Sequence, residues 1–267
     1  MTLDAAAFAA VREAPHLLVL SGAGISAESG IPTFRDDDGF WTRFPPEQFA
    51  NWPALRQQLD ADPARLATFL HHVIAPVAAA RPNAAHRALA EHQSRATVTV
   101  ITQNIDGLHQ AGGSRTVLEV HGSLLRLVDA AGQPEGDVSR QELATVAERL
   151  VGVRTRPGVL RAMFPLVRPR HALPVRPDVV LFGDPMAEPD WTLAQAAVEK
   201  ADALLVVGTS AAVYPAAYVP EWFEALGRPI VTVGLERPQF GAWLEGRATE
   251  RVPPLLADSR DGDANGR

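Results

Sequence analysis

The segment LVLSGAGISAESGIPTFR, at residues 18–35, carries glycines at Gly22 and Gly24 directly after an apolar run. Small residues let backbone N–H groups approach an anion such as a pyrophosphate, and a helix that begins at this point favours negative charge. The third glycine of a Gly-x-Gly-x-x-Gly fingerprint is missing, because Ala27 occupies its position. Taken alone, the motif leaves an ordinary tight turn as the alternative to nucleotide binding.

A second segment, TQNIDGLHQAGG at residues 102–113, brings Gln103, Asn104, Asp106 and His109 close together in the chain. Amide, carboxylate and imidazole groups can hydrogen-bond a ribose and a carboxamide. The alternative is that Asn104 and Asp106 only cap a helix.

Two further segments follow apolar runs. His121, in EVHGS, can accept a proton near neutral pH, although a single histidine is more often structural. Gly208, Thr209 and Ser210 again combine a small residue with hydroxyl groups. Structural needs alone would have to produce four such loops independently, so their joint occurrence favours a binding and catalytic site.

Apolar runs alternate along the chain with helix-like stretches. Continuous apolar runs are typical of parallel strands covered by helices on both faces, so the predicted class is α/β with a Rossmann-like doubly wound parallel sheet. Ligands of such sheets bind beyond the carboxyl ends of the strands, where the four segments lie. The predicted strands are residues 16–22, 96–104, 116–122, 178–183, 203–210 and 229–236, and the predicted helices are residues 4–14, 83–93, 190–200 (N-cap Asp190) and 215–226.

Two stretches leave this alternation and return to it. Residues 36–80 are rich in Trp, Phe, Pro and Ala with helical spacing, and residues 124–175 are polar, rich in Pro and Arg, and mostly without predicted strands. We expect them to pack together as a smaller inserted module over one edge of the sheet. The nucleotide-binding domain would comprise residues 1–35, 81–123 and 176–255, and residues 256–267 would form a disordered tail.

Composition limits the function classes. The 267 residues are 46% hydrophobic, enough for a large core, and the net charge is −6 with scattered basic residues, so we expect no binding to nucleic acid or to an anionic membrane. The sequence shows no signal-peptide pattern and no apolar run long enough to span a membrane, which favours the cytoplasm. The absence of cysteine excludes disulfides, a thiol nucleophile and Cys-ligated zinc. The oligomeric state is not predicted.

The four segments, together with RPDVVLFGDPM and GTSAAVYPAA, resemble the sirtuins, a family of NAD-dependent protein deacylases, in order and spacing. The resemblance covers about residues 15–250. It implies a Rossmann-like domain and a smaller module with helical and zinc-ribbon parts, which matches the two insertions.

The resemblance also implies roles for individual residues. His121 and Asn104 would be catalytic, and Asp106 would bind the nicotinamide carboxamide. Val180, Phe182 and Gly183 would contact the substrate, where an acyl-lysine peptide pairs as a strand. The remaining residues expected to contact NAD are Gly22, Ala23, Gly24, Ser26, Phe34, Arg35, Gln103, Gly208, Thr209 and Ser210.

By the same resemblance, NAD is consumed as a co-substrate. The acyl oxygen would attack the ribose carbon that bears nicotinamide, His121 would accept a proton from a ribose hydroxyl, and nicotinamide and O-acyl-ADP-ribose would be released. The predicted function is NAD-dependent protein-lysine deacylase, with an acyl-lysine protein or peptide as partner. One alternative is a mono-ADP-ribosyltransferase or NAD glycohydrolase, because a protein nucleophile or water can intercept the same ribose. Another is a non-catalytic NAD-sensing module.

The zinc ribbon is where this chain departs from the resemblance. Most sirtuins carry four zinc-binding cysteines, whose positions here fall at about Asp129 and Gly132, and near Leu166 and His171. Asp129 and His171 alone cannot make a closed tetrahedral site, so we predict no metal and expect apolar packing to replace the zinc. Residues 139–153 are predicted to be a helix with a capping box between Ser139 and Glu142. The candidate core residues are Leu143, Val146, Leu150, Leu160, Met163, Phe164 and Leu166.

Two other departures concern ligands. Gly234 stands where sirtuins usually have an Asn that meets the adenosine ribose, so the affinity for NAD is expected to differ. Leu70 and Val73 stand where sirtuins that prefer succinyl or malonyl groups have Tyr and Arg. An acidic acyl group would lack a charge partner there, which favours acetyl or a longer apolar acyl group.

Overall fold

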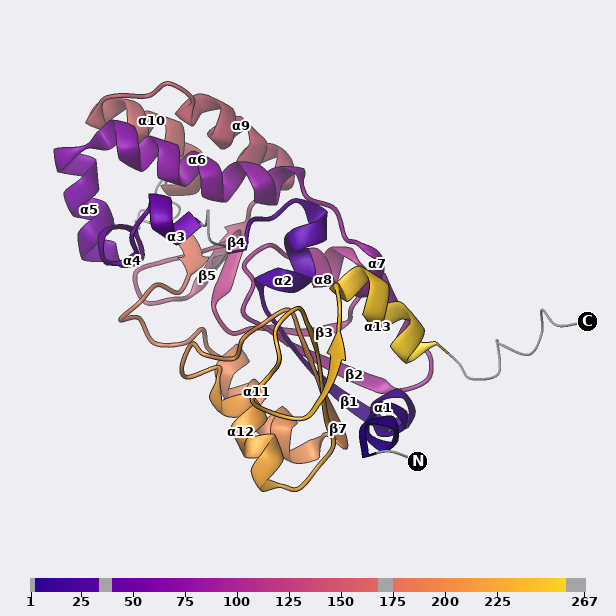
Figure 1. Ribbon diagram of the computed structural model, residues 1–267. Helices are drawn as coiled ribbons and strands as arrows, with labels where there is room; N and C mark the ends of the chain where they lie inside the picture. Colours follow the sequence, from indigo (N-terminus) through magenta and orange to yellow (C-terminus); the bar gives the residue numbers. More distant parts are fainter. Residues whose placement is uncertain (1–2, 34–39, 168–174, 258–267) are drawn as a thin grey trace, which may run out of the picture.

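The computed structural model describes residues 3–33, 40–167 and 175–257 (Figure 1). Its larger sheet contains β1 (His16–Ser21), β2 (Thr97–Thr102), β3 (Thr116–Glu119), β7 (Ala203–Val207), β8 (Ile230–Gly234) and β9 (Ala242–Glu245). These strands are parallel and lie in the order β3-β2-β1-β7-β8-β9, which is the Rossmann order. The predicted α/β class with a doubly wound parallel sheet is confirmed, and β9 is a strand that the sequence patterns did not reveal.

Helices cover both faces of this sheet. Leu17 and Val19 of β1 pack with α1 (Leu3–Glu13), α7 (Ala84–His92) and α13 (Ala248–Leu256) on one face. Leu18 and Leu20 pack with α11 (Asp190–Lys200) and α12 (Tyr218–Ala225) on the other. Burial on both faces explains why the strand reads as an unbroken apolar run, because alternate side chains point to opposite sides.

A second sheet corrects two of the predictions. β4 (Gly122–Val128) pairs antiparallel with β5 (Pro134–Asp137) and with β6 (Arg176–Val179). The strand predicted at residues 178–183 ends at Val179 and belongs to this small sheet. The predicted strand at residues 116–122 also divides, because β3 ends at Glu119 and Gly122 turns the chain with a φ of 73°. A side chain at Gly122 would collide with the Asp178 carbonyl, so only glycine lets β6 approach here.

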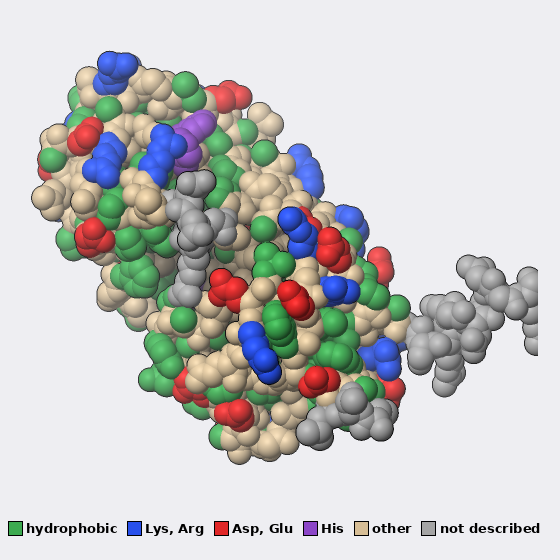
Figure 2. Space-filling model, viewed as in Figure 1, with side chains coloured by type: hydrophobic (Ala, Val, Ile, Leu, Met, Phe, Trp, Pro, Cys, Tyr) green, Lys and Arg blue, Asp and Glu red, His purple; other side chains and the backbone are tan. Residues whose placement is uncertain are grey.

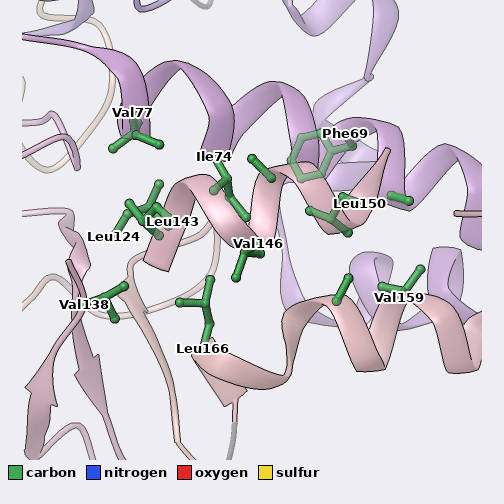
Figure 3. Close-up of a cluster of buried hydrophobic side chains, with 14 of the residues drawn as sticks. Phe69, Ile74, Val77, Leu124, Val138, Leu143, Val146, Leu150, Val159 and Leu166 are labelled. Carbon is green, nitrogen blue, oxygen red and sulfur yellow. The ribbon is translucent and has the colours of Figure 1, made fainter. Parts of the chain in front are cut away.

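Residues of the two inserted stretches share one hydrophobic core. Phe69, Ile74 and Val77 of α6 face Leu150, Val146 and Leu143 of α9, respectively (Figure 3). These helices sit together at one end of the molecule, beyond the large sheet (Figure 1). The helices of this group, which we call the helical module, are α3 (Phe40–Arg43), α4 (Pro46–Phe49), α5 (Trp52–Ala61), α6 (Pro63–Ala79), α9 (Arg140–Leu150) and α10 (Arg156–Val167).

The predicted core of this module is correct for most of its residues. Leu143, Val146, Leu150 and Leu166 are buried, and Met163 packs against them. The prediction that Leu160 and Phe164 belong to the core was wrong, because their side chains are 46% and 57% exposed. α10 turns Val159, Ala162 and Leu166 inward at helical spacing, which places Leu160 and Phe164 on its outer face.

A side-chain cap begins α9 but not α11. The predicted box at α9 is confirmed: Glu142 N–H donates to the Ser139 hydroxyl, and Ser139 N–H donates to the Glu142 carboxylate at 2.8 Å. The prediction that Asp190 caps α11 was wrong, since Pro189 holds that position. Asp190 is the first helical residue, and its carboxylate accepts from Glu119 N–H at 2.9 Å.

At the C-terminal end, Leu256 is the first residue of the predicted tail, and it is buried at the end of α13. Residues 258–267 lie outside the described residues. No helix in the described ranges is long and apolar enough to cross a bilayer. On the face in Figure 2, the described basic and acidic side chains are interspersed.

Candidate active site

The glycine loops after β1 and β7 meet at the point where the strand order reverses, which is where ligands bind in this fold. Gly22 N–H donates to the Val207 carbonyl at 3.1 Å, and Gly24 N–H donates to the Gly208 carbonyl at 2.8 Å. A Cβ at Gly24 would lie 2.7 Å from Gly208 Cα. Here the glycines are therefore required by the packing of one loop on the other. α2 (Ala23–Ser26) follows the first loop as a single short turn.

Asn104, Ser26 and Asp106 form a buried polar network that joins the first glycine loop to the loop after β2. Asn104 Nδ2 donates to the Gly22 carbonyl at 3.0 Å and to Ser26 Oγ at 3.2 Å. Ser26 Oγ donates to Asp106 Oδ2 at 2.7 Å, and Leu108 N–H donates to Asp106 Oδ1 at 2.8 Å. Three predicted site residues are thus brought together.

The Asp106 carboxylate is desolvated. Burial raises its pKa, while the hydrogen bonds from Leu108 and Ser26 and the charge of Arg140 act in the opposite direction. A buried carboxylate with fixed donors on both oxygens is suited to recognising an amide N–H or a cationic ring.

His121 lies next to this network through Gln103, the neighbour of Asn104. Its Nδ1 is 3.1 Å from the Gln103 carbonyl oxygen, which can only accept, so Nδ1 carries the proton and Nε2 carries the lone pair. Burial lowers the pKa of His121, partly offset by this hydrogen bond. The imidazole is therefore held neutral, in the tautomer that accepts a proton at Nε2.

Thr209 is tied to the same site, because Gln103 Nε2 donates to its hydroxyl at 3.0 Å. Ser210 is exposed beside it. Phe34 and Arg35, predicted to contact NAD, lie outside the described residues.

Ser21 and Thr102, at the ends of β1 and β2, were not predicted as site residues. Ser21 Oγ donates to Thr102 Oγ1 at 2.9 Å, and Asn104 N–H donates to the same oxygen at 3.1 Å. His109 Nε2 lies 2.8 Å from Ser21 Oγ. Because Ser21 gives its proton to Thr102, His109 donates from Nε2, and burial lowers its pKa to about 3. Hydroxyl residues ending two adjacent strands were the signal that could have revealed this support.

The segment after β6 lies against His121. Val180 N–H donates to the His121 carbonyl at 3.0 Å, and Phe182 N–H donates to the Ala50 carbonyl at 2.8 Å. Phe182 is 57% exposed, and Gly183 has a φ of 94°. The residues predicted to contact a peptide therefore bridge the imidazole loop and the helical module.

The position aligned with the zinc ribbon holds a turn. Asp129 Oδ1 accepts from Ala131 N–H and from Gln133 N–H, both at 2.8 Å. His171 lies outside the described residues. Among the residues that the structure describes, no three His, Cys, Asp or Glu side chains are grouped so that they could hold a metal ion.

The fold and this polar cluster at the carboxyl edge of the sheet place the chain among Rossmann-like α/β proteins. The model of the Sir2 family matches residues 22–215. A "NAD-dependent protein deacylase" of Mycolicibacterium paratuberculosis is 42% identical over 251 residues, covering 90% of this chain and 96% of that protein. The chain belongs to the Sir2 family.

Solved structures agree with this assignment. A Sir2 homolog–NAD complex superimposes with a TM-score of 0.74 at 32% identity, covering 98% of this chain and 95% of that one. A Sir2–p53 peptide–NAD+ complex gives 0.71 at 26% identity, covering 98% and 99%.

Proposed function

We propose that this chain is an NAD-dependent protein-lysine deacylase that releases nicotinamide and O-acyl-ADP-ribose. The observation that carries the proposal is the His121 tautomer: Nδ1 is fixed on the Gln103 carbonyl, which leaves the lone pair at Nε2. Gln103 directly precedes Asn104, which belongs to the network with Ser26 and Asp106. Family membership and the named activity of the Mycolicibacterium relative support it.

The residues present fit NAD as the co-substrate. A dinucleotide has two phosphates, two riboses and a carboxamide, and the site offers backbone N–H groups, hydroxyls, amides and one buried carboxylate. In this proposal the phosphates are held by Gly22, Ala23, Gly24, Ser26, Gly208, Thr209 and Ser210. Phe34 and Arg35 also contact the cofactor. Gln103 and Asn104 bind the ribose, and Asp106 binds the carboxamide. NAD supplies an activated glycosidic bond to nicotinamide.

His121 accepts the proton of a sugar hydroxyl at Nε2, and Nδ1 stays bound to Gln103 throughout. A positioned general base contributes about 10²- to 10⁴-fold to a rate. In this proposal Val180, Phe182 and Gly183 hold the acyl-lysine peptide. The Sir2–p53 peptide–NAD+ complex supports a peptide as the substrate.

The preferred acyl group is acetyl or a longer apolar chain. Leu70 and Val73, at the positions where an acidic acyl group would need a polar partner, pack on the hydrophobic core of the helical module. A carboxylate brought to these side chains would lose water without gaining a partner. Succinyl-lysine peptides should therefore react more slowly than acetyl- and fatty-acyl-lysine peptides.

We further propose that the protein is cytoplasmic. We also propose that residues 36–80 and 124–175 form one module, separate from the nucleotide-binding domain, and that this module folds without zinc. The shared core of α6, α9 and α10 supports a single module held by apolar packing. Elemental analysis of the purified protein tests it: stoichiometric zinc would reject a metal-free module.

Mass spectrometry of the products tests the function. Incubation with NAD and an acetyl-lysine peptide should yield free lysine peptide and O-acetyl-ADP-ribose. His121→Asn should lower the rate about 10²-fold or more, while the matched control His72→Asn, a half-buried histidine of α6, should not. ADP-ribosylated protein or free ADP-ribose alone would establish the transferase or glycohydrolase alternative. NAD binding without any product would establish the sensing module.

A further inference from the structure

Arg140 is the first residue of α9 and belongs to the segment that stands in place of a zinc ribbon. A positive charge at a helix N-terminus opposes the helix dipole, so local preference disfavours arginine at this position. Its side chain is also partly buried, where an unpaired guanidinium would be costly. The contacts that it makes outside its own helix must offset both costs.

One of these contacts is with the end of α6. Arg140 Nη1 donates to the Val77 carbonyl, in the last turn of that helix. Carbonyls in the last turn have no partner within their own helix, and a cation satisfies them while matching the negative end of the dipole. Arg140 therefore ties the start of α9 to the end of α6, beside the packed Val77 and Leu143 side chains (Figure 3).

The second contact reaches the candidate active site. Arg140 Nη2 donates to the Asp106 backbone carbonyl at 2.7 Å. The next residue, Gly107, has a φ of 64°, and a Cβ there would lie 2.5 Å from Leu125 Cδ1 and 3.9 Å from Arg140 Nη2. Arg140 and Leu125 therefore restrict the loop after β2 at Asp106 and Gly107. Asp106 is the residue whose carboxylate accepts from Ser26.

Asp106 is accordingly held from two directions. Ser26 and Leu108 N–H fix its carboxylate, and Arg140 fixes its backbone. We propose that Arg140 is a positioning residue, through which the helical module sets the orientation of Asp106 and thereby the affinity for NAD and nicotinamide. This inference rests on the proposed function for the identity of the ligand.

The test compares Arg140→Met, which keeps the apolar stem but removes all donors, with Arg140→Lys, which keeps one charged donor group. Two controls separate positioning from stability. Arg149→Met removes an exposed arginine from the same helix, and Leu143→Ala weakens the module core without touching Asp106. The dissociation constant for NAD is measured by calorimetry without peptide, well below the melting temperature of every variant.

Arg140→Met should weaken NAD binding about tenfold, Arg140→Lys should weaken it less, and Arg149→Met should leave it unchanged. Amide hydrogen exchange of residues 103–108 in the free protein should be faster in Arg140→Met than in Leu143→Ala. The KM for peptide should stay within about twofold of that of the wild type.

Equal NAD affinity and equal exchange in Arg140→Met and Leu143→Ala would overturn the inference, since the arginine would then act only on stability. If the wild type binds NAD but deacylates no peptide while Arg140→Met still weakens binding, the proposed function fails and the inference stands. If the wild type deacylates peptide and Arg140→Met binds NAD normally, the inference fails alone. A wild type that binds no NAD overturns both.

Discussion

The Nδ1 atom of His121 lies 3.1 Å from the carbonyl oxygen of Gln103, and Gln103 directly precedes Asn104. One residue therefore fixes the tautomer of the proposed base, and the next anchors the polar network to the glycine loop. This short link couples the imidazole to the strand-end loops.

The pH dependence of kcat/KM for the peptide should reflect the burial of His121. The base must be neutral to act, and burial lowers its pKa from the ordinary value of 6.5. Activity should hold as the pH falls through 6.5 and decline only at lower pH, because the neutral form persists down to the lowered pKa. A pH-rate profile on the free enzyme measures this. An acid limb centred at or above 6.5 would contradict it.

Ser26→Ala should weaken the use of NAD. The substitution removes the donor to Asp106 Oδ2 and one acceptor of Asn104 Nδ2. Without these hydrogen bonds Asp106 and Asn104 are no longer held in place, and a loss of about 1–3 kcal/mol of their interaction with NAD in the transition state corresponds to roughly 5- to 150-fold in kcat/KM for NAD. Steady-state kinetics with varied NAD measures the change, and the exposed Ser94→Ala is the control. Unchanged kinetics in Ser26→Ala would mean that the network does not shape the site.

Leu143→Ala should lower the free energy of unfolding by about 2–5 kcal/mol, because Leu143 is fully buried in the module core. Leu160→Ala removes the same atoms from the outer face of α10 and should change it by less than about 0.5 kcal/mol. Urea unfolding of both variants gives the comparison. Similar losses for the two would show that apolar packing at this core does not hold the module together.

Stability should fall in mild acid because of buried histidines. Burial lowers the pKa of His109 to about 3 and that of His86 to about 4, whereas both would titrate near 6.5 in the unfolded chain. Between these values the unfolded chain binds more protons, so the free energy of unfolding decreases as the pH falls below 6.5 and levels off near the folded pKa. Each histidine accounts for up to about 1.4 kcal/mol per pH unit.

Unfolding of the wild type and of His109→Gln by urea at pH 7.5 and pH 5 measures this effect. The variant cannot gain the proton, and its amide can still donate toward Ser21, so it should lose less stability on acidification. An equal loss in both proteins would assign the acid sensitivity to other groups.

The large sheet could be predicted from sequence because its strands are buried on both faces, and unbroken apolar runs such as residues 16–21 report that burial directly. The break between β3 and β4 could not, since TVLEVHG reads as one run. The turn at Gly122 depends on the approach of β6, which is distant in the chain.

The candidate site also contains residues that the sequence could predict and residues that it could not. His121, Asn104 and Asp106 carry chemistry in their side-chain types and could be named from the sequence. Arg140 acts through two backbone carbonyls, and no pattern of residue types encodes that contact. Leu160 and Phe164 were misassigned because apolar character alone does not give the rotational phase of α10.

The most direct test of the central claim is the stoichiometry of nicotinamide release, measured with NAD in the presence and absence of an acetyl-lysine peptide. The proposed chemistry predicts one nicotinamide for each deacetylated peptide, no appreciable release without peptide, and loss of both products in His121→Asn. Nicotinamide release that is independent of the peptide, or unaffected by His121→Asn, would contradict it.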